Sequence, residues 1–114
     1  SVREALNLLF ELGGSNSKIA VLGDMLELGA SAGEFHEQVG AFAKERGIDL
    51  LFLLGEFADR TSRGFGVEKS RVFEDAQSLA AALRGELKSG DWALVKGSRR
   101  MKMEEIVKKI TGDK

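Results

Sequence analysis

Several residue types are missing or scarce in this chain of 114 residues, and each absence excludes a kind of chemistry. There is no cysteine, so disulfide bonds and thiolate metal sites are excluded. His36 is the only histidine, so a zinc site built from several histidines is excluded as well. No apolar run approaches the roughly 20 residues that a membrane-spanning helix needs, and no signal-peptide pattern is visible. Proline is also absent, so no backbone N–H is lost to helices or sheets.

The charges of the chain are balanced between the two signs. Lysine and arginine number 17 and aspartate and glutamate 18, which gives a formal net charge of -1. A nucleic-acid or anionic-membrane surface would need a basic patch, so we expect neither partner. Apolar residues make up 43% and charged residues 31%, which is typical of a globular protein. We therefore expect one domain over residues 1–114, monomeric, with the cytoplasm as its default location.

A helix pattern begins directly at Ser1, and no initiator methionine precedes it. We therefore expect the chain to be a piece cut from a longer protein.

Short apolar runs alternate with amphipathic helix patterns along the whole chain. The runs are bounded by turn residues, which is typical of strands buried on both faces of a parallel sheet. Capping residues mark three helix starts: Ser1 with Glu4, Ser31 with Glu34, and Asp75. The predicted helices cover residues 1–12, 31–46, 57–62, 76–87 and a segment after residue 100, and the predicted strands cover residues 19–22, 50–54, 71–73 and 92–95.

This alternation predicts an α/β fold with three layers, in which right-handed crossovers join four parallel strands. Two strand orders are plausible, 3-2-1-4 and 2-1-3-4, and we prefer 3-2-1-4. That order places the first and fourth strands side by side where the winding of the chain reverses. Open α/β sheets bind ligands at such a point, so the loops after these two strands should share one crevice.

The loop after the fourth strand carries Lys96, Gly97, Ser98 and Arg99. Glycine lets the backbone approach a ligand closely, and amides near a helix N-terminus favour anions. Lys96 and Arg99 add positive charge, and arginine can hold a carboxylate with two hydrogen bonds. The alternative is a solvated basic turn in which Ser98 is an ordinary N-cap. Lysine precedes the glycine here, so the stretch is not a Walker A phosphate loop.

The loop after the first strand carries Asp24 and Glu27, and Gly55 ends the second strand. Asp24 could accept a hydrogen bond from an ammonium group, or hold Lys96 or Arg99 in place. Glu27 could do the same or face water. The alternative for Asp24 is an Asx-type turn with its own backbone. Metal ligation by a lone histidine is improbable, so we expect His36 to be a half-buried packing residue that hydrogen-bonds to the Asp24 loop.

Both loops and the helices behind them resemble a known family. The stretch KIAVLGDMLELG, then His36 with Val39-Gly40, then ALVKGSR followed by residues 103–107, is similar to the C-terminal domain of the Mur ligases. The resemblance runs through nearly the whole chain and includes the order of elements. It implies a Rossmann-like domain that closes over the site of a three-domain enzyme and brings in the incoming amino component.

The resemblance also implies a reaction in peptidoglycan precursor synthesis. Mur ligases use ATP and magnesium to phosphorylate the carboxylate of a UDP-muramyl acceptor, and an incoming amine then attacks the acyl phosphate. This chain has Gly55-Glu56-Phe57-Ala58 where the diaminopimelate-adding branch carries Asp-Asn-Pro-Arg. That favours the branch that adds D-alanyl-D-alanine to UDP-N-acetylmuramoyl-tripeptide.

By resemblance, the loops at Asp24, Gly55 and 96–99 would face the dipeptide and the nucleotide. The chain contains no phosphate loop, so ATP and magnesium would bind mainly outside it, and the isolated chain should be inactive. The alternative is a stand-alone α/β module that binds an anion or a nucleotide.

Overall fold

The structure is a computed structural model, and it describes residues 1–25 and 29–112 of the chain. Each helix and strand predicted from the sequence is present. The α-helices are α1 (Val2–Gly13), α2 (Ala32–Glu45), α3 (Ala58–Phe65), α4 (Ala76–Glu86) and α5 (Glu104–Thr111). The strands are β1 (Lys18–Leu22), β2 (Leu50–Leu54), β3 (Ser70–Phe73) and β4 (Trp92–Lys96), and short 3-10 helices lie at Gly29–Ser31, Val67–Lys69 and Arg99–Met101. Among the described residues, no helix has both the length and the apolar composition that crossing a bilayer requires.

The strands form one parallel sheet in the order β3-β2-β1-β4. The preferred order is therefore confirmed, and the order 2-1-3-4 is wrong. Residue Leu22 at the end of β1 pairs with Leu53 on one side and Lys96 on the other. The carboxyl ends of β1, β2 and β4 therefore lie at the same edge of the sheet.

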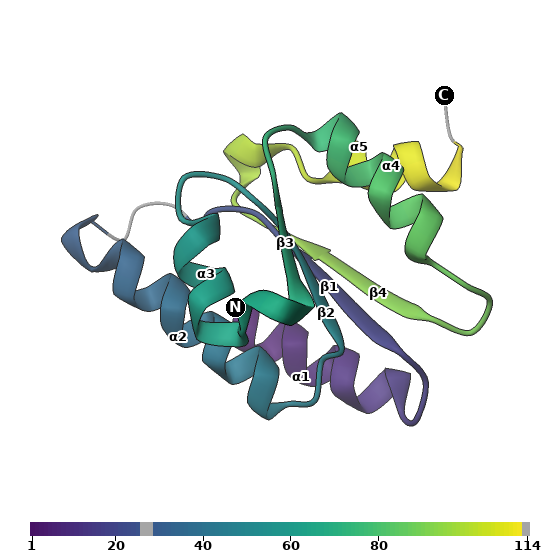
Figure 1. Cartoon of the computed structure of the whole chain (residues 1–114), viewed down its shortest axis with the longest axis horizontal. Coiled ribbons are helices and arrows are strands. Elements are labelled where there is room, and N and C mark those ends of the chain that lie inside the picture. Colours follow the sequence, from purple (N-terminus) through teal and green to yellow (C-terminus); the bar gives the residue numbers. More distant parts are fainter. Residues whose placement is uncertain (26–28, 113–114) are drawn as a thin grey trace.

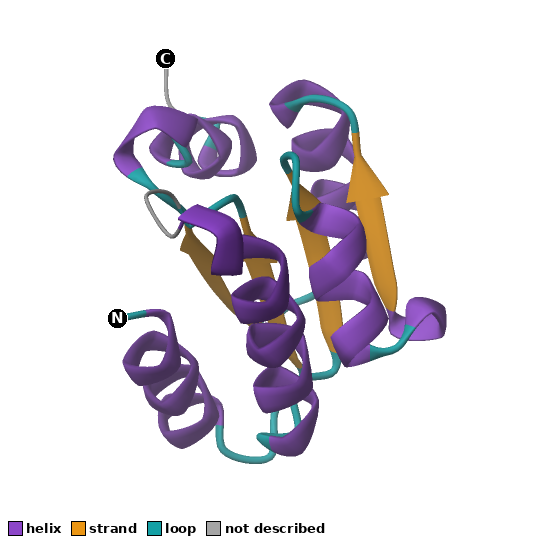
Figure 2. Ribbon diagram, turned by 90° about the vertical axis from the view of Figure 1, so that its left-hand side faces the viewer, coloured by secondary structure: helices purple, strands orange, loops and turns teal. Residues whose placement is uncertain are grey.

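Helices cover both faces of the sheet, with α1, α2 and α3 on one face and α4 and α5 on the other (Figure 1). Figure 2 shows the same layers after a quarter turn. Alternate residues of β1 and β2 point to opposite faces, so the central strands are buried on both sides. The α1–α3 side buries Leu6, Ala20, Leu22, Val39, Leu51 and Leu53, and the α4–α5 side buries Ile19, Val21, Phe52, Leu79, Leu83 and Ile106.

The predicted caps hold at two helix starts and fail at the third. Ser1 and Glu4 form a complete capping box at α1. Asp75 caps α4 by accepting the N–H of Ser78, and that hydrogen bond lowers the pKa of the Asp75 carboxyl. Ser31 precedes α2 but makes no side-chain cap bond, so the predicted second capping box is wrong. The 3-10 helix at Gly29–Ser31 leaves Ser31 at φ -89° and ψ 2°, whereas a capping serine needs an extended backbone.

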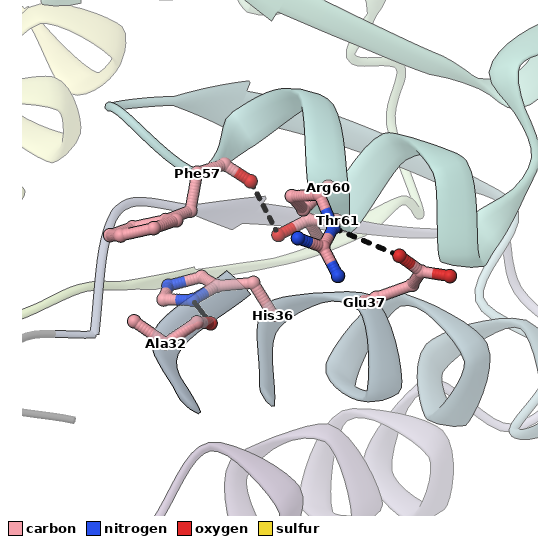
Figure 3. Close-up of polar contacts among 6 residues, drawn as sticks. All are labelled: Ala32, His36, Glu37, Phe57, Arg60 and Thr61. Carbon is pink, nitrogen blue, oxygen red and sulfur yellow. Dashed lines mark hydrogen bonds and ion pairs between the residues drawn. The ribbon is translucent and has the colours of Figure 1, made fainter. Parts of the chain in front are cut away.

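Helices α2 and α3 pack unusually closely, and two glycines make this possible. A Cβ added at Gly40 would overlap the carbonyl oxygen of Thr61, and one added at Gly64 would overlap the carbonyl oxygen of Glu37. An ion pair also joins the helices, since Arg60 Nε lies 2.9 Å from Glu37 Oε1 (Figure 3). This pairing fixes the start of α3 beside the start of α2, at the carboxyl edge of the sheet.

Candidate functional site

The loops after β1 and β4 touch through their backbones, as the sequence predicts. The N–H of Gly23 donates to the carbonyl of Lys96 at 2.9 Å, and the N–H of Ser98 donates to the carbonyl of Asp24 at 2.9 Å. These two hydrogen bonds continue the β1–β4 pairing beyond the ends of the strands. Residues 24 and 96 therefore belong to one rim at the point where the winding of the sheet reverses.

The Asp24 side chain is engaged by a third loop, the one that follows β2. Its Oδ2 accepts the N–H of Glu56 at 2.8 Å and its Oδ1 accepts the N–H of Phe57 at 3.0 Å, while only 7% of the residue is exposed. The alternative given for Asp24, a turn with its own backbone, is therefore not what forms. No ion pair joins Asp24 to Lys96 or Arg99 within the described part of the chain. Its pairing with a substrate ammonium group stays a prediction.

Gly55 provides the room for this carboxylate. Its φ of +125° lies in the region that favours glycine, and a Cβ at this position would overlap the Asp24 carboxylate. The loops after β1 and β2 are therefore joined by an Asp24–Gly55 contact, and those after β1 and β4 by backbone hydrogen bonds.

Gly97 has a packing role that the sequence did not suggest. A Cβ at Gly97 would lie 2.7 Å from Cγ of Met103, and one at Gly23 would lie 2.9 Å from Sδ of the same side chain. Met103 is 5% exposed and belongs to the core on the α4–α5 side. The two glycines therefore let the loops after β1 and β4 approach each other beneath this methionine.

The expected helix N-terminus at residues 97–100 is not present. Arg99–Met101 forms a 3-10 helix, and α5 begins only at Glu104, after Lys102 has turned the chain with a φ of 52°. The Ser98 amide is already bound to the Asp24 carbonyl, and the serine makes no side-chain cap bond. Positive charge at this loop therefore comes from side chains: Lys96 is half-buried, and Arg99 is exposed.

A cavity of about 370 Å³ opens beside this loop. The first turn of α1 lines it together with Met25, Phe35 and residues 96–98. The wall is apolar at Met25 and Phe35 and cationic at Arg3 and Lys96. The Ser98 hydroxyl oxygen is buried and has no hydrogen-bond partner among residues 1–25 and 29–112. The cavity thus combines an apolar wall with two cations, which suits a small ligand that carries an anionic group.

His36 makes the predicted hydrogen bond to the loop after β1. Its Nε2 accepts the N–H of Met25 at 3.0 Å, and its Nδ1 lies 2.6 Å from the carbonyl of Ala32. The ring stacks on Phe57 with a centroid separation of 4.8 Å (Figure 3). The residue is only 3% exposed, so it is more deeply buried than the sequence indicated.

Of the other predicted site residues, Glu27 lies outside the described residues. Within the described part of the chain, no group of three or more histidine, cysteine, aspartate or glutamate side chains could hold a metal ion. Sequence reasoning missed three contributors to this edge: the amides of Glu56 and Phe57, the Phe57 ring and Met103. Nothing local marks them, because each acts on residues far away in the chain.

Comparison with known proteins identifies relatives of the entire fold. A family model described as "Mur ligase, glutamate ligase domain" matches residues 1–99. The chain is 38% identical over 114 residues to the UDP-N-acetylmuramoyl-tripeptide–D-alanyl-D-alanine ligase of Bacillus subtilis, covering 96% of this chain and 25% of the relative. It is 36% identical over 112 residues to the Escherichia coli protein of the same name, covering 96% of this chain and 24% of the relative.

Two solved structures share the fold. The crystal structure of MurF from Acinetobacter baumannii superposes with a TM-score of 0.86 at 27% identity, covering 98% of this chain and 25% of that one. MurF ligase from Thermotoga maritima, solved in complex with ADP, gives a TM-score of 0.74 at 26% identity, covering 97% of this chain and 26% of that one. The chain therefore spans about a quarter of the length of the relatives that it matches.

Proposed function

The chain belongs to the Mur ligase family, and from that premise we propose that it is the C-terminal, substrate-closing domain of an ATP-dependent ligase. The proposed reaction joins D-alanyl-D-alanine to UDP-N-acetylmuramoyl-tripeptide, a step in cytoplasmic synthesis of the peptidoglycan precursor. Support comes from the relatives in Bacillus subtilis and Escherichia coli that carry this name at 38% and 36% identity. The diaminopimelate-adding motif is also missing after β2.

We assign ATP and magnesium mainly to other parts of the longer enzyme. The stretch at Lys96 lacks the glycine and serine order of a phosphate loop. The ADP complex of the Thermotoga maritima neighbour supports nucleotide use by the family. The role of this chain is consequently to bind and orient the incoming dipeptide, with no chemical step assigned to its residues.

The cavity beside residues 96–98 is the proposed dipeptide site. D-Alanyl-D-alanine carries one carboxylate and two methyl groups. Lys96, which lines the cavity, would hold the carboxylate together with Arg99, the residue that follows the lining segment 96–98. Met25 and Phe35 would contact the methyl groups. The amine would then project from the cavity toward the acceptor that the rest of the enzyme holds.

Asp24, Gly55 and His36 support the site by fixing its walls. The Asp24 oxygens already accept two amides, so the side chain holds the loop, and its proposed pairing with a substrate ammonium group would use the remaining lone pairs. The single observation that carries the proposal is the contact between the two loops, in which the Ser98 amide lies 2.9 Å from the Asp24 carbonyl. That contact brings Lys96 of one loop and Met25 of the other to one cavity.

The test uses the longer ligase with Lys96→Ala and Arg99→Ala. Loss of a charged hydrogen-bond partner should cost about 1–3 kcal/mol in kcat/KM for the dipeptide. Lys44→Ala, on the exposed last turn of α2, is the matched control and should leave kcat/KM unchanged. Wild-type kinetics in both site variants would remove the assignment.

Calorimetric titration of the isolated chain separates this proposal from a stand-alone binding module. A substrate-closing domain should show negligible affinity for ATP, D-alanyl-D-alanine and UDP-N-acetylmuramoyl-tripeptide, because its neighbours complete the site. Tight binding of ATP by the isolated chain would instead support an independent nucleotide-binding module.

A further inference from the structure

His36 lies where three segments of the site meet. Its backbone is in the first turns of α2, its Nε2 bonds to Met25 on the loop after β1, and its ring stacks on Phe57 at the start of α3. The N–H of Phe57 in turn donates to the Asp24 carboxylate. Asp24, Met25, His36 and Phe57 therefore close a ring of contacts, and in that ring the side chain of His36 contributes both a hydrogen bond and a stacking surface.

The two partners of the imidazole determine where its proton lies. The Ala32 carbonyl can only accept a hydrogen bond, so Nδ1 must carry the proton. The Met25 N–H can only donate, so Nε2 must be unprotonated. His36 is thus held as the neutral Nδ1–H tautomer. A second proton would turn Nε2 into a donor facing another donor, and the hydrogen bond to Met25 would be lost.

The Met25 backbone is a sensitive place for such a hydrogen bond. Met25 lines the 370 Å³ cavity, and the carbonyl of its neighbour Asp24 accepts the Ser98 amide on the opposite loop. A shift of the Met25 backbone would therefore move the apolar wall relative to Lys96 and Ser98. Buried hydrogen bonds from another element are what keep a loop in a single position.

We propose that His36 is a positioning residue, which holds Met25 through neutral Nε2 and thereby sets the wall of the cavity beside Lys96. The identity of the ligand rests on the proposed function, whereas the hydrogen bond and its effect on the cavity do not. His36 does not contact the reacting atoms in this proposal. It acts through the backbone of Met25.

The elements that contact His36 also carry charged residues, which bear on any pH measurement. They are Asp24 on the loop after β1, Glu34 and Glu37 on α2, and Glu56, Asp59 and Arg60 at the start of α3. Asp24 is bound to two amides and Glu37 to Arg60. A measurement against pH should therefore follow the magnetic resonance signal of the His36 ring itself. Titration of a neighbouring carboxylate is then recognised as a separate event.

The experiment is nuclear magnetic resonance of the chain with three forms of residue 36. Ring nitrogen spectra of the wild type should show a protonated Nδ1 and an unprotonated Nε2. His36→Gln places an acceptor oxygen near Nε2, and His36→Phe keeps the stack on Phe57 but removes the acceptor. The Met25 amide should exchange about tenfold faster in His36→Phe than in the wild type, with much of the protection restored in His36→Gln. The Val21 amide, in the centre of β1, serves as the internal reference for global unfolding.

Two outcomes would overturn the proposal. Equal protection of the Met25 amide in His36→Phe and the wild type would show that the hydrogen bond does not hold the loop. If His36→Phe fails to fold, the wild type decides, because its Met25 amide signal must then titrate with the same midpoint as the His36 ring. A Met25 signal that ignores the ring titration would also reject the proposal.

Kinetics of the longer ligase give a second readout that separates positioning from overall stability. His36→Phe should raise KM for the dipeptide several-fold with little change in kcat, and His36→Gln should lie close to the wild type. If amide exchange shows that the Met25 hydrogen bond is lost in His36→Phe but KM for the dipeptide is unchanged, the positioning role is overturned. An unaffected Lys96→Ala beside an affected His36→Phe would instead reject the dipeptide assignment and leave the positioning role intact.

Discussion

The Asp24 carboxylate occupies the space that a side chain at Gly55 would need. The two residues end neighbouring strands, and the backbone of Gly55 has a φ of +125°. The carboxylate reaches past this glycine to the amides of Glu56 and Phe57. One contact therefore decides how the loops after β1 and β2 are joined.

Gly55→Ala should destabilise the chain by about 2–4 kcal/mol, because the added methyl group meets both a disfavoured backbone region and a buried carboxylate. Urea unfolding followed by circular dichroism would measure the change. Gly85→Ala is the matched control, since a Cβ at that position of α4 meets nothing within 4 Å. The control should be stabilised by about 0.5–1 kcal/mol through helix propensity. Equal effects of the two substitutions would disprove the close Asp24–Gly55 contact.

Asp24→Ala should cost about 2–4 kcal/mol, because two backbone N–H groups lose a charged acceptor in a buried position. Asp24→Asn retains one acceptor oxygen and should fall between the alanine variant and the wild type. Differential scanning calorimetry of the three proteins gives the order of their Tm values. An asparagine variant less stable than the alanine variant would contradict the assigned hydrogen bonds.

Gly40→Ala and Gly64→Ala should each cost at least about 2 kcal/mol, although alanine is the better helix former. In both cases the added methyl group would overlap a backbone carbonyl of the facing helix, and a backbone cannot move aside as a side chain can. Thermal unfolding of the two variants beside Gly85→Ala would test this. A gain in stability at residue 40 or 64 would show that α2 and α3 are further apart.

Asp75 should make α4 sensitive to acid. The Ser78 N–H holds the pKa of the Asp75 carboxyl below its usual range, so the folded chain binds a proton there less readily than the unfolded chain. The contribution of Asp75 to the free energy of unfolding is therefore complete above the unfolded-state pKa of 3.8. It is lost as the pH falls through the lower pKa of the folded state. Asp75→Asn keeps a neutral acceptor and removes this titration. Its Tm should fall less than that of the wild type between about pH 6 and about pH 3, and equal slopes would exclude the effect.

The order and topology of the elements could be predicted because they depend on local patterns. Apolar runs such as 50–54 are bounded by clear turn residues, and the right-handed crossover leaves few ways to wind the chain. The meeting of the Asp24 and Lys96 loops followed from the strand order. The link from His36 to the Asp24 loop could also be inferred, because a polar ring beside the core stripe of α2 needs a partner.

The details of the site depend on contacts between distant residues, and here the sequence was insufficient. Asp24 bonds to amides 32 and 33 residues further along the chain, and backbone amides carry no sequence signal. The delayed start of α5 follows from Lys102, which adopts a left-handed backbone without being a glycine. Val107 of α5 is 42% exposed, whereas its neighbour Ile106 is fully buried.

Strand β4 pairs only with β1 within residues 1–25 and 29–112, so its other side presents a row of free backbone donors and acceptors. Trp92, which is 39% exposed, and the exposed Ala93 lie along this strand. An unpaired edge strand of this kind can pair with a strand from another molecule. The apparent molar mass of the chain alone, measured by light scattering, should therefore rise with concentration, and Ala93→Lys should suppress that rise without altering the monomer fold.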